Sequence, residues 1–122
     1  MKGMKGPLYL GIDFGTSYIK CTVLDVDGEI VFQYRTSSRI LNPKPGFYEV
    51  DPVETWWKGF LNICKKLEEQ ELISRIKYVG VSSICGSFVP VNENFEPTYN
   101  AILYGIDKRA QKQIESLNKD YP

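Results

Sequence analysis

The chain has 122 residues with 15 basic and 15 acidic side chains, so its formal net charge is zero. This length suits one folded domain, and without a block of like charge nothing indicates a nucleic acid or an anionic membrane as partner. Three widely spaced cysteines and no histidine argue against a zinc site or a disulfide framework. We therefore expect a small-molecule ligand. We also expect a cytoplasmic location, because no segment has the apolar length of a signal peptide or membrane span.

The N-terminal part of the chain is predicted to form three strands. Residues 1–7 repeat Met-Lys-Gly and are expected to be a disordered or appended start. The strands are predicted at Leu8–Ile12, Ile19–Leu24 and Glu29–Tyr34. The pair Asp27-Gly28 is a strong hairpin signal, so the second and third strands should be antiparallel neighbours.

The segment between the first two strands carries Asp13, Gly15 and Lys20. Because side chains alternate along a strand, Asp13 should lie on the face opposite Leu10 and Ile12. A glycine turn leaves backbone N–H groups free to meet an anion, a carboxylate suits Mg²⁺, and a lysine binds phosphate as a point charge. The pattern favours a phosphate site, and the alternative is an ordinary hairpin with exposed charges.

A helix is predicted from Pro52 to about Gln70. Asp51 is a suitable N-cap, proline fits the first helical position, and Glu54 completes a capping box. Trp56 and Trp57 are expected to be mostly core, with sugar stacking as an alternative for Trp57. The apolar stripe facing the sheet is predicted to contain Trp57, Phe60 or Leu61, Cys64 and Leu67.

The remainder of the chain is predicted to alternate strands and a helix. Cys85 is expected to be a small buried hydrophobic residue. The predicted elements are a strand at Ile76–Ile84 covered on both faces, an edge strand at Ser87–Val91, a polar turn at Asn92–Phe95, an extended segment at Thr98–Tyr104 and a helix at Lys108–Leu117. These elements predict an α/β domain in which helices flank a mixed β-sheet.

Three segments, in this order, resemble the FGGY family of carbohydrate kinases within the sugar kinase, actin and heat-shock ATPase superfamily. Each motif alone is a weak indication, but the three together span most of the chain. The resemblance implies a ribonuclease H-like, actin-like ATPase fold. The matching segments are Asp13 to Lys20, Pro45 to Trp57 and Pro97 to Ala110, the last with Tyr104 where the family has tryptophan and with one extra residue before Asp107.

The resemblance assigns roles to particular residues. It implies that ATP and Mg²⁺ are bound by Asp13, Gly15, Thr16, Ser17 and Lys20, with Asp13 acting on the metal. It implies that the sugar is bound by Asp107 and Arg109, and Ser83 is a further candidate for that site. The alternative for the last helix is that Asp107 is its N-cap while Arg109 is merely exposed.

The function that the resemblance implies is ATP-dependent phosphorylation of a small sugar or polyol, with a pentulose such as xylulose as the leading substrate. Ile84 and Gly86 stand where xylulose kinases have glutamine and histidine, so the identity of the sugar stays open. Residues 8–122 are expected to be part of an N-terminal domain, inactive alone, with the catalytic base and the second, nucleotide-binding domain elsewhere. A different phosphotransferase of the superfamily and an actin-like assembly or regulatory module are the alternatives, and a homodimer is one possible oligomeric state.

Overall fold

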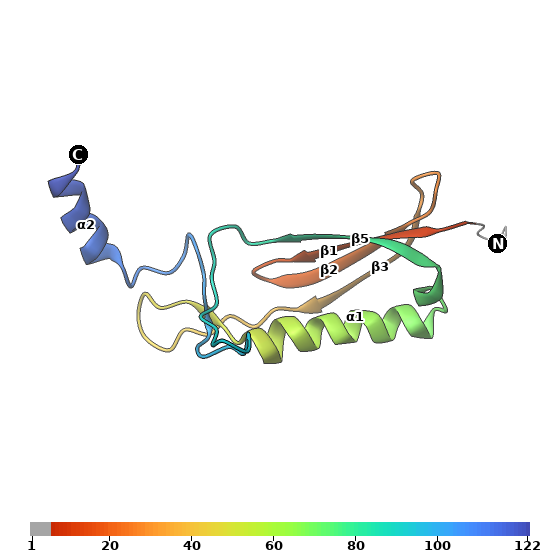
Figure 1. Ribbon diagram of the computed structural model, residues 1–122, viewed down its shortest axis with the longest axis horizontal. Coiled ribbons are helices and arrows are strands. Elements are labelled where there is room, and N and C mark those ends of the chain that lie inside the picture. Colours follow the sequence, from red (N-terminus) through yellow and green to blue (C-terminus); the bar gives the residue numbers. More distant parts are fainter. Residues whose placement is uncertain (1–5) are drawn as a thin grey trace.

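The computed structural model describes residues 6–122 (Figure 1). Its elements, in chain order, are β1 (Leu8–Phe14), β2 (Tyr18–Leu24), β3 (Ile30–Ser37), β4 (Glu49–Val50), the π-helix η1 (Pro52–Trp57), α1 (Lys58–Glu69), the 3₁₀ helix η2 (Ile73–Arg75), β5 (Ile76–Ser83), β6 (Ala101–Ile102) and α2 (Gln111–Asp120).

The main sheet has four strands in the order β3-β2-β1-β5. β1, β2 and β3 are successive antiparallel neighbours, whereas β5 returns beside β1 in the parallel direction after α1 has crossed one face (Figure 1). β4 and β6 form a separate two-stranded sheet. The parallel pairing matters for function, because it brings the carboxyl ends of β1 and β5 to the same end of the sheet.

The core lies between α1 and the face of the sheet that it covers. Alternate side chains of β1 and β2 are buried there, as predicted, and they meet the buried face of α1. Each such side chain contributes about 1.5–3 kcal/mol when fully buried. The buried cluster consists of Leu8, Leu10, Ile12, Ile19, Cys21, Val23, Ile63, Leu67 and Leu72.

Two local predictions are confirmed by the backbone. β2 and β3 form the antiparallel hairpin that Asp27-Gly28 indicates, with Gly28 in the left-handed region at φ +81°. The Asp51 carboxylate accepts from the N–H groups of Val53 and Glu54, both at 2.9 Å. The first turn is a π-helix, however, and Glu54 pairs with Lys58 instead of closing a capping box.

The prediction of which residues on the first helix face the sheet was partly wrong. Trp56 packs against the core, whereas Trp57 is 56% exposed and its ring lies beside that of Phe60. Of the two alternatives Phe60 and Leu61, Phe60 packs against the core and Leu61 is exposed. Leu67 is buried as predicted, and the fully buried Ile63 was not predicted. The positions that face the core recur every three or four residues, and all except Leu67 lie beside the predicted ones: Trp56, Gly59, Ile63 and Leu67.

The prediction that the Ile76–Ile84 strand is covered on both faces is contradicted. β5 is an edge strand in the described part of the chain, and its residues after Ile76 are all exposed. Val79 and Val81 lie beside Leu10 and Ile12 in the sheet. They are exposed because α1 runs over the neighbouring strands and leaves β5 bare on that face.

The C-terminal third has less regular structure than predicted. Ser87–Val91 forms isolated bridges at Phe88 and Val91 and no strand, and strand pairing in the Thr98–Tyr104 segment is limited to β6. The polar turn is present, because the Asn92 side chain accepts from two following N–H groups. Cys85 is exposed, contrary to the prediction of burial.

The last helix begins at Gln111, three residues later than predicted, and extends away from the body of the molecule (Figure 1). All of its residues are exposed. None of the helices within residues 6–122 combines the length and apolar character needed to cross a membrane.

The predicted disordered or appended start comprises residues 1–7, of which 1–5 lie outside the described residues. Gly6 is held in place, since its carbonyl oxygen accepts from Arg75 Nη2 at 3.1 Å. The folded region therefore begins slightly before residue 8.

Replacing Ile63 by alanine should lower the free energy of unfolding by about 2–5 kcal/mol, because the substitution leaves a cavity at a residue with no exposed surface. Leu61→Ala, on the 47% exposed side of the same helix, should change it by less than about 1 kcal/mol. Urea denaturation followed by circular dichroism measures both. Equal losses would contradict the assignment of the buried face.

Candidate functional site

The carboxyl ends of β1 and β5 place a small polar cluster on the face of the sheet opposite α1. Asp13 pairs with Ser82 across the parallel strands and with Lys20 across the antiparallel ones. Ser82 Oγ donates to Asp13 Oδ1 at 2.8 Å, and Lys20 Nζ lies 3.9 Å from Asp13 Oδ2. The three strands thus present a hydroxyl, a carboxylate and an ammonium group in one row.

The cluster is open to solvent. The side chains of Lys20 and Asp13 are 57% and 46% exposed, so their ion pair contributes little to stability. The row borders a trough of about 580 Å³ whose floor includes Gly11 and Gly80. Ligands of open α/β sheets bind beyond the carboxyl ends of the strands, and this trough lies at that position.

The turn from β1 to β2 differs from the prediction in one respect. The N–H of Gly15 is not free for an anion, because it donates to the carbonyl of Tyr18 at 3.0 Å. A Cβ on Gly15 would lie 2.9 Å from that same oxygen, so glycine is required for the turn itself. Within residues 6–122, no hydrogen bond uses the N–H or hydroxyl of Thr16 or Ser17, and these groups are available to a ligand.

The donor set at Asp13 fits a magnesium ion that keeps most of its water. The described residues contain no group of three or more acidic, histidine or cysteine side chains that could hold a metal. Asp13 Oδ1 is bonded to Ser82, whereas Oδ2 has Lys20 only at 3.9 Å. One or two carboxylates with several waters and substrate phosphates are the usual Mg²⁺ environment, so Asp13 can supply the protein's share.

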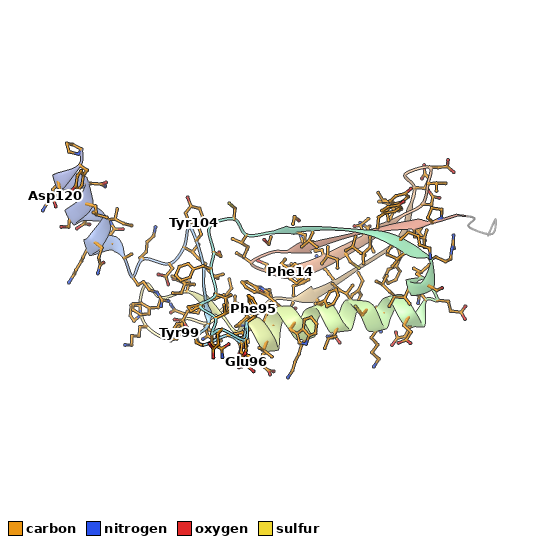
Figure 2. The ribbon with its side chains drawn as sticks, viewed as in Figure 1. Phe14, Phe95, Glu96, Tyr99, Tyr104 and Asp120 are labelled. Atoms are coloured by element: carbon orange, nitrogen blue, oxygen red, sulfur yellow. The ribbon has the colours of Figure 1, made fainter. Side chains whose placement is uncertain are left out.

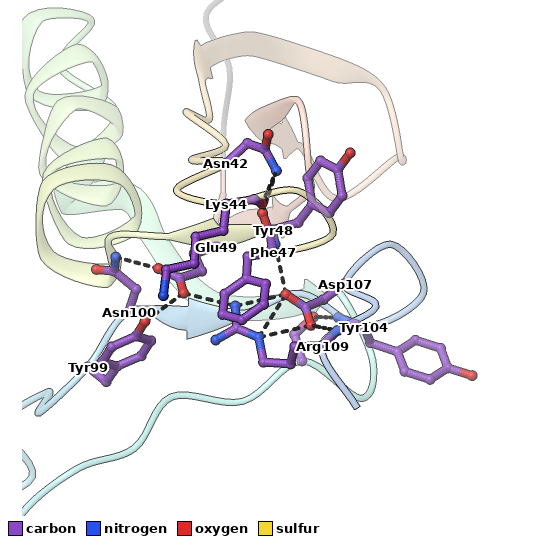
Figure 3. Close-up of polar contacts among 11 residues, drawn as sticks. Asn42, Lys44, Phe47, Tyr48, Glu49, Tyr99, Asn100, Tyr104, Asp107 and Arg109 are labelled. Atoms are coloured by element: carbon purple, nitrogen blue, oxygen red, sulfur yellow. Dashed lines mark hydrogen bonds and ion pairs between the residues drawn. The ribbon is translucent and has the colours of Figure 1, made fainter. Parts of the chain in front are cut away.

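A second, buried polar cluster joins the loop before α1 to the loop before α2 (Figure 3). Asp107 lies at its centre, with its side chain 6% exposed. Its Oδ2 accepts from the N–H of Tyr48 at 2.7 Å and from Arg109 Nη2 at 2.8 Å. Its Oδ1 accepts from the N–H and Nε of Arg109 at 3.0 and 2.9 Å.

Glu49 of β4 forms the other half of this cluster and is 2% exposed. Its Oε1 accepts from Tyr99 Oη and from Arg109 Nη2, each at 2.8 Å, and its Oε2 accepts from Asn100 Nδ2 at 2.9 Å. The Arg109 guanidinium also stacks over the ring of Phe47, 4.2 Å from its centroid. One arginine therefore bridges two buried carboxylates.

The charges in this cluster shift one another's pKa values. The hydrogen bonds from Arg109 outweigh burial and lower the pKa of Asp107 from its ordinary 3.8 to about 2. Burial alone raises the pKa of Glu49, but its hydrogen bonds from Asn100, Arg109 and Tyr99 together bring it below the usual value. The pKa of Arg109 is raised, chiefly by its hydrogen bonds to Asp107. All three side chains are therefore charged at neutral pH.

A cavity of about 470 Å³ lies against the Asp107 side of the cluster. Its wall includes Gly86, Tyr104, Asp107 and Arg109. Tyr104 is 70% exposed and stands out from the body between β5 and α2 (Figure 2). A Cβ on Gly86 would lie 2.8 Å from the Tyr104 ring, so glycine permits the close approach of this aromatic side chain. The volume is in the usual range for small-molecule sites.

Comparison with known proteins identifies the family. Residues 8–121 match the model of the N-terminal domain of the FGGY family of carbohydrate kinases. The chain belongs to this FGGY family.

Among its relatives, glycerol kinase 5 of Xenopus laevis is 28% identical over 119 residues, which are 96% of this chain and 25% of that protein. Xylulose kinase of Staphylococcus xylosus is 29% identical over 111 residues, 91% of this chain and 23% of that protein. The chain thus spans about a quarter of the length of these relatives.

A solved structure gives the same result for the fold. Plasmodium falciparum glycerol kinase with ADP superimposes with a TM-score of 0.85 and 24% identity, over 96% of this chain and 24% of that one. The expected α/β fold of the ribonuclease H-like, actin-like ATPase type, with a mixed sheet and flanking helices, is therefore confirmed.

In this FGGY domain the structure brings some of the predicted site residues together and separates others. Asp13 and Lys20 are adjacent, as are Asp107 and Arg109. Ser83, in contrast, pairs with Phe14 and so points to the opposite face of the sheet from Asp13. Neither of the alternatives for the last helix holds: Ala110 occupies the N-cap position, and the Arg109 side chain is 20% exposed and doubly paired.

Neither Ser82 nor Glu49 was predicted from the sequence as a site residue. Ser82 is one residue before the predicted Ser83, and the alternation of β5 decides which of the two faces Asp13. Glu49 stands inside the matching segment Pro45 to Trp57 as an acidic residue between the apolar Tyr48 and Val50. A charged residue within an apolar run of sequence is the signal from which a buried, paired carboxylate could have been predicted.

Gly15→Ala should lower the free energy of unfolding by about 1–3 kcal/mol, because the new methyl group overlaps the Tyr18 carbonyl and the turn must open. Gly80→Ala is the matched control in β5, since no atom lies within 4 Å of the added Cβ, and it should change stability by less than about 0.5 kcal/mol. Thermal and urea denaturation compare the two variants. A neutral Gly15→Ala would show that the turn tolerates a side chain.

Asp107 should also make the free energy of unfolding depend on pH in the acid range. Its folded-state pKa of about 2 is below the ordinary 3.8, so its contribution is complete above about pH 4 and is lost as pH falls toward 2. The difference in unfolding free energy between the wild type and Asp107→Asn should therefore be largest near neutral pH and shrink in acid. Urea titrations at several pH values measure it, and a difference independent of pH would refute the assignment.

Proposed function

We propose that the full-length protein is a kinase that transfers a phosphoryl group from Mg·ATP to a hydroxyl group of a small sugar or polyol, with a pentulose such as xylulose as the leading substrate. The observation that carries the proposal is the row of Ser82, Asp13 and Lys20 at the open end of the sheet. Family membership and relatives named as xylulose and glycerol kinases support it.

Phosphoryl transfer depends mainly on holding the phosphates and balancing their charge. In this proposal, Lys20 reaches the terminal phosphates and the free N–H and hydroxyl groups of Thr16 and Ser17 hold phosphate oxygens. Gly15 keeps the turn that presents those groups. Bound Mg²⁺ would neutralise charge on the transferred phosphoryl group, and Asp13 would hold it directly or through its waters.

The sugar is proposed to bind beside the segment from Tyr104 to Arg109. Asp107 and Arg109 line the 470 Å³ cavity there, and Ser83 ends the strand that leads toward it. The turn between β1 and β2 and the carboxyl end of β5 both face the end of the molecule that holds this segment (Figure 1). A ligand extending from one to the other would place phosphate and sugar at the same end of the fold.

The 122-residue chain by itself is proposed to be inactive and to bind ATP weakly. No residue in it is assigned as the general base that accepts the hydroxyl proton. The base and the adenosine-binding surface are assigned to a second domain of the full-length protein. Sugar phosphorylation by the purified 122-residue chain would refute this part of the proposal.

The central test is a coupled assay of ADP release by the full-length protein with ketoses, aldoses, glycerol and gluconate. Asp13→Asn should lower kcat by about 10²–10³-fold, as expected for the loss of a charge that acts on the transferring group, while leaving the melting temperature nearly unchanged. Asp27→Asn, a carboxylate in the exposed turn between β2 and β3, is the control and should retain wild-type kcat.

Two results would overturn the proposal. One is wild-type kcat in Asp13→Asn. The other is the absence of activity on every polyol, which together with concentration-dependent oligomers on sizing would favour an assembly or regulatory module.

A further inference from the structure

Asp107 has no acceptor capacity left for a sugar hydroxyl. Four N–H groups already donate to it, one from Tyr48 and three from Arg109. An ionised carboxylate offers about four lone-pair positions, and this one is 6% exposed. Direct recognition of hydroxyls by its oxygens would require these hydrogen bonds to break.

Arg109 is held from the opposite side by Glu49. The same Nη2 atom that reaches Asp107 also donates to Glu49 Oε1 at 2.8 Å. Tyr99 Oη donates to the same Oε1 and Asn100 Nδ2 donates to Oε2, so both oxygens of the Glu49 carboxylate accept hydrogen bonds from neighbouring side chains. The chain of contacts therefore runs from β4, through Arg109, to the wall of the cavity beside Tyr104 (Figure 3).

This arrangement is expected to add little to the free energy of unfolding compared with apolar residues of the same size. Two buried carboxylates share one guanidinium, so the cluster carries a net negative charge, and desolvation of buried ion pairs commonly cancels their attraction. What the arrangement does provide is a single geometry, because the planar guanidinium must satisfy both carboxylates at once. It fixes segment 104–109 relative to β4.

We propose that Glu49 is a positioning residue for the sugar site: through Arg109 it locks Asp107, and the locked segment shapes the cavity in which the sugar binds. In this view Asp107 and Arg109 affect substrate binding indirectly, because they hold the cavity wall, including the backbone at Tyr104, in place. The inference rests on the proposed function and specifies how its sugar end is built.

The test uses Glu49→Gln in the full-length protein. Glutamine keeps the size of the side chain and one acceptor, but it removes the charge that faces Arg109 and turns an N–H₂ group toward one of the surrounding donors. The KM for the sugar should rise about tenfold or more, because small displacements of positioning groups have effects of this size. The KM for ATP should stay within about twofold of the wild type.

The matched control is Glu54→Gln, which breaks an exposed ion pair with Lys58 and should leave both KM values unchanged. The double variant Glu49→Gln with Asp107→Asn adds a second readout. If both residues hold the same segment, their effects on the KM for the sugar should be clearly less than multiplicative.

The outcomes separate this inference from the function on which it rests. A wild-type protein that phosphorylates no sugar or polyol overturns both. An active wild type whose Glu49→Gln variant loses melting temperature and active fraction but keeps the wild-type KM for the sugar overturns the positioning role alone. Fully multiplicative effects in the double variant would likewise contradict a shared lock.

Discussion

The burial of alternate β1 residues under α1 decides where the polar chemistry of this domain can lie. Leu8, Leu10 and Ile12 occupy the covered face, so the two-residue period of the strand sends Asp13 to the other. β2 repeats the pattern and brings Lys20 beside it, while β5 adds Ser82 from the parallel side. The row at the end of the sheet is therefore a direct product of core packing, and no special loop conformation is needed to build it.

The second cluster depends on a different constraint, the cost of burying charge. Glu49 is 2% exposed and lies in the two-residue strand β4, between Leu41 and β6. It stays ionised because three side chains from the segment around β6 and α2 converge on it. The irregular C-terminal third is thus organised around polar contacts, whereas the N-terminal part is organised around apolar ones.

Features set by local periodicity could be predicted from the sequence, and features set by distant neighbours could not. The burial pattern of β1 and β2, the Asp27-Gly28 hairpin and the Asp51 cap all follow from a few adjacent residues. The exposure of Val79 on β5 could not be predicted in this way, because the apolar pattern of the strand is the same whether or not another element covers it.

The polar contacts of the candidate site illustrate the same limit. Arg109 and Glu49 are 60 residues apart, and only the completed fold brings them together. Asp107 precedes a helix and is a residue type that favours the N-cap. In the structure its oxygens accept from the Tyr48 N–H and the Arg109 side chain, and Ala110 is the N-cap residue. In the first motif, the glycine turn was predicted to leave backbone N–H groups free for an anion, but the N–H of Gly15 donates to the Tyr18 carbonyl within the turn itself.

β5 has a consequence for handling the isolated 122-residue chain. In the described part of the molecule its outer edge presents unpaired backbone groups beside Val79 and Val81, and such an edge is a template for strand addition by another molecule. Lys77 at its beginning is the main charged gatekeeper, and a formal net charge of zero supplies no long-range repulsion. Self-association along this edge should therefore set the solubility limit of the chain when it is concentrated alone.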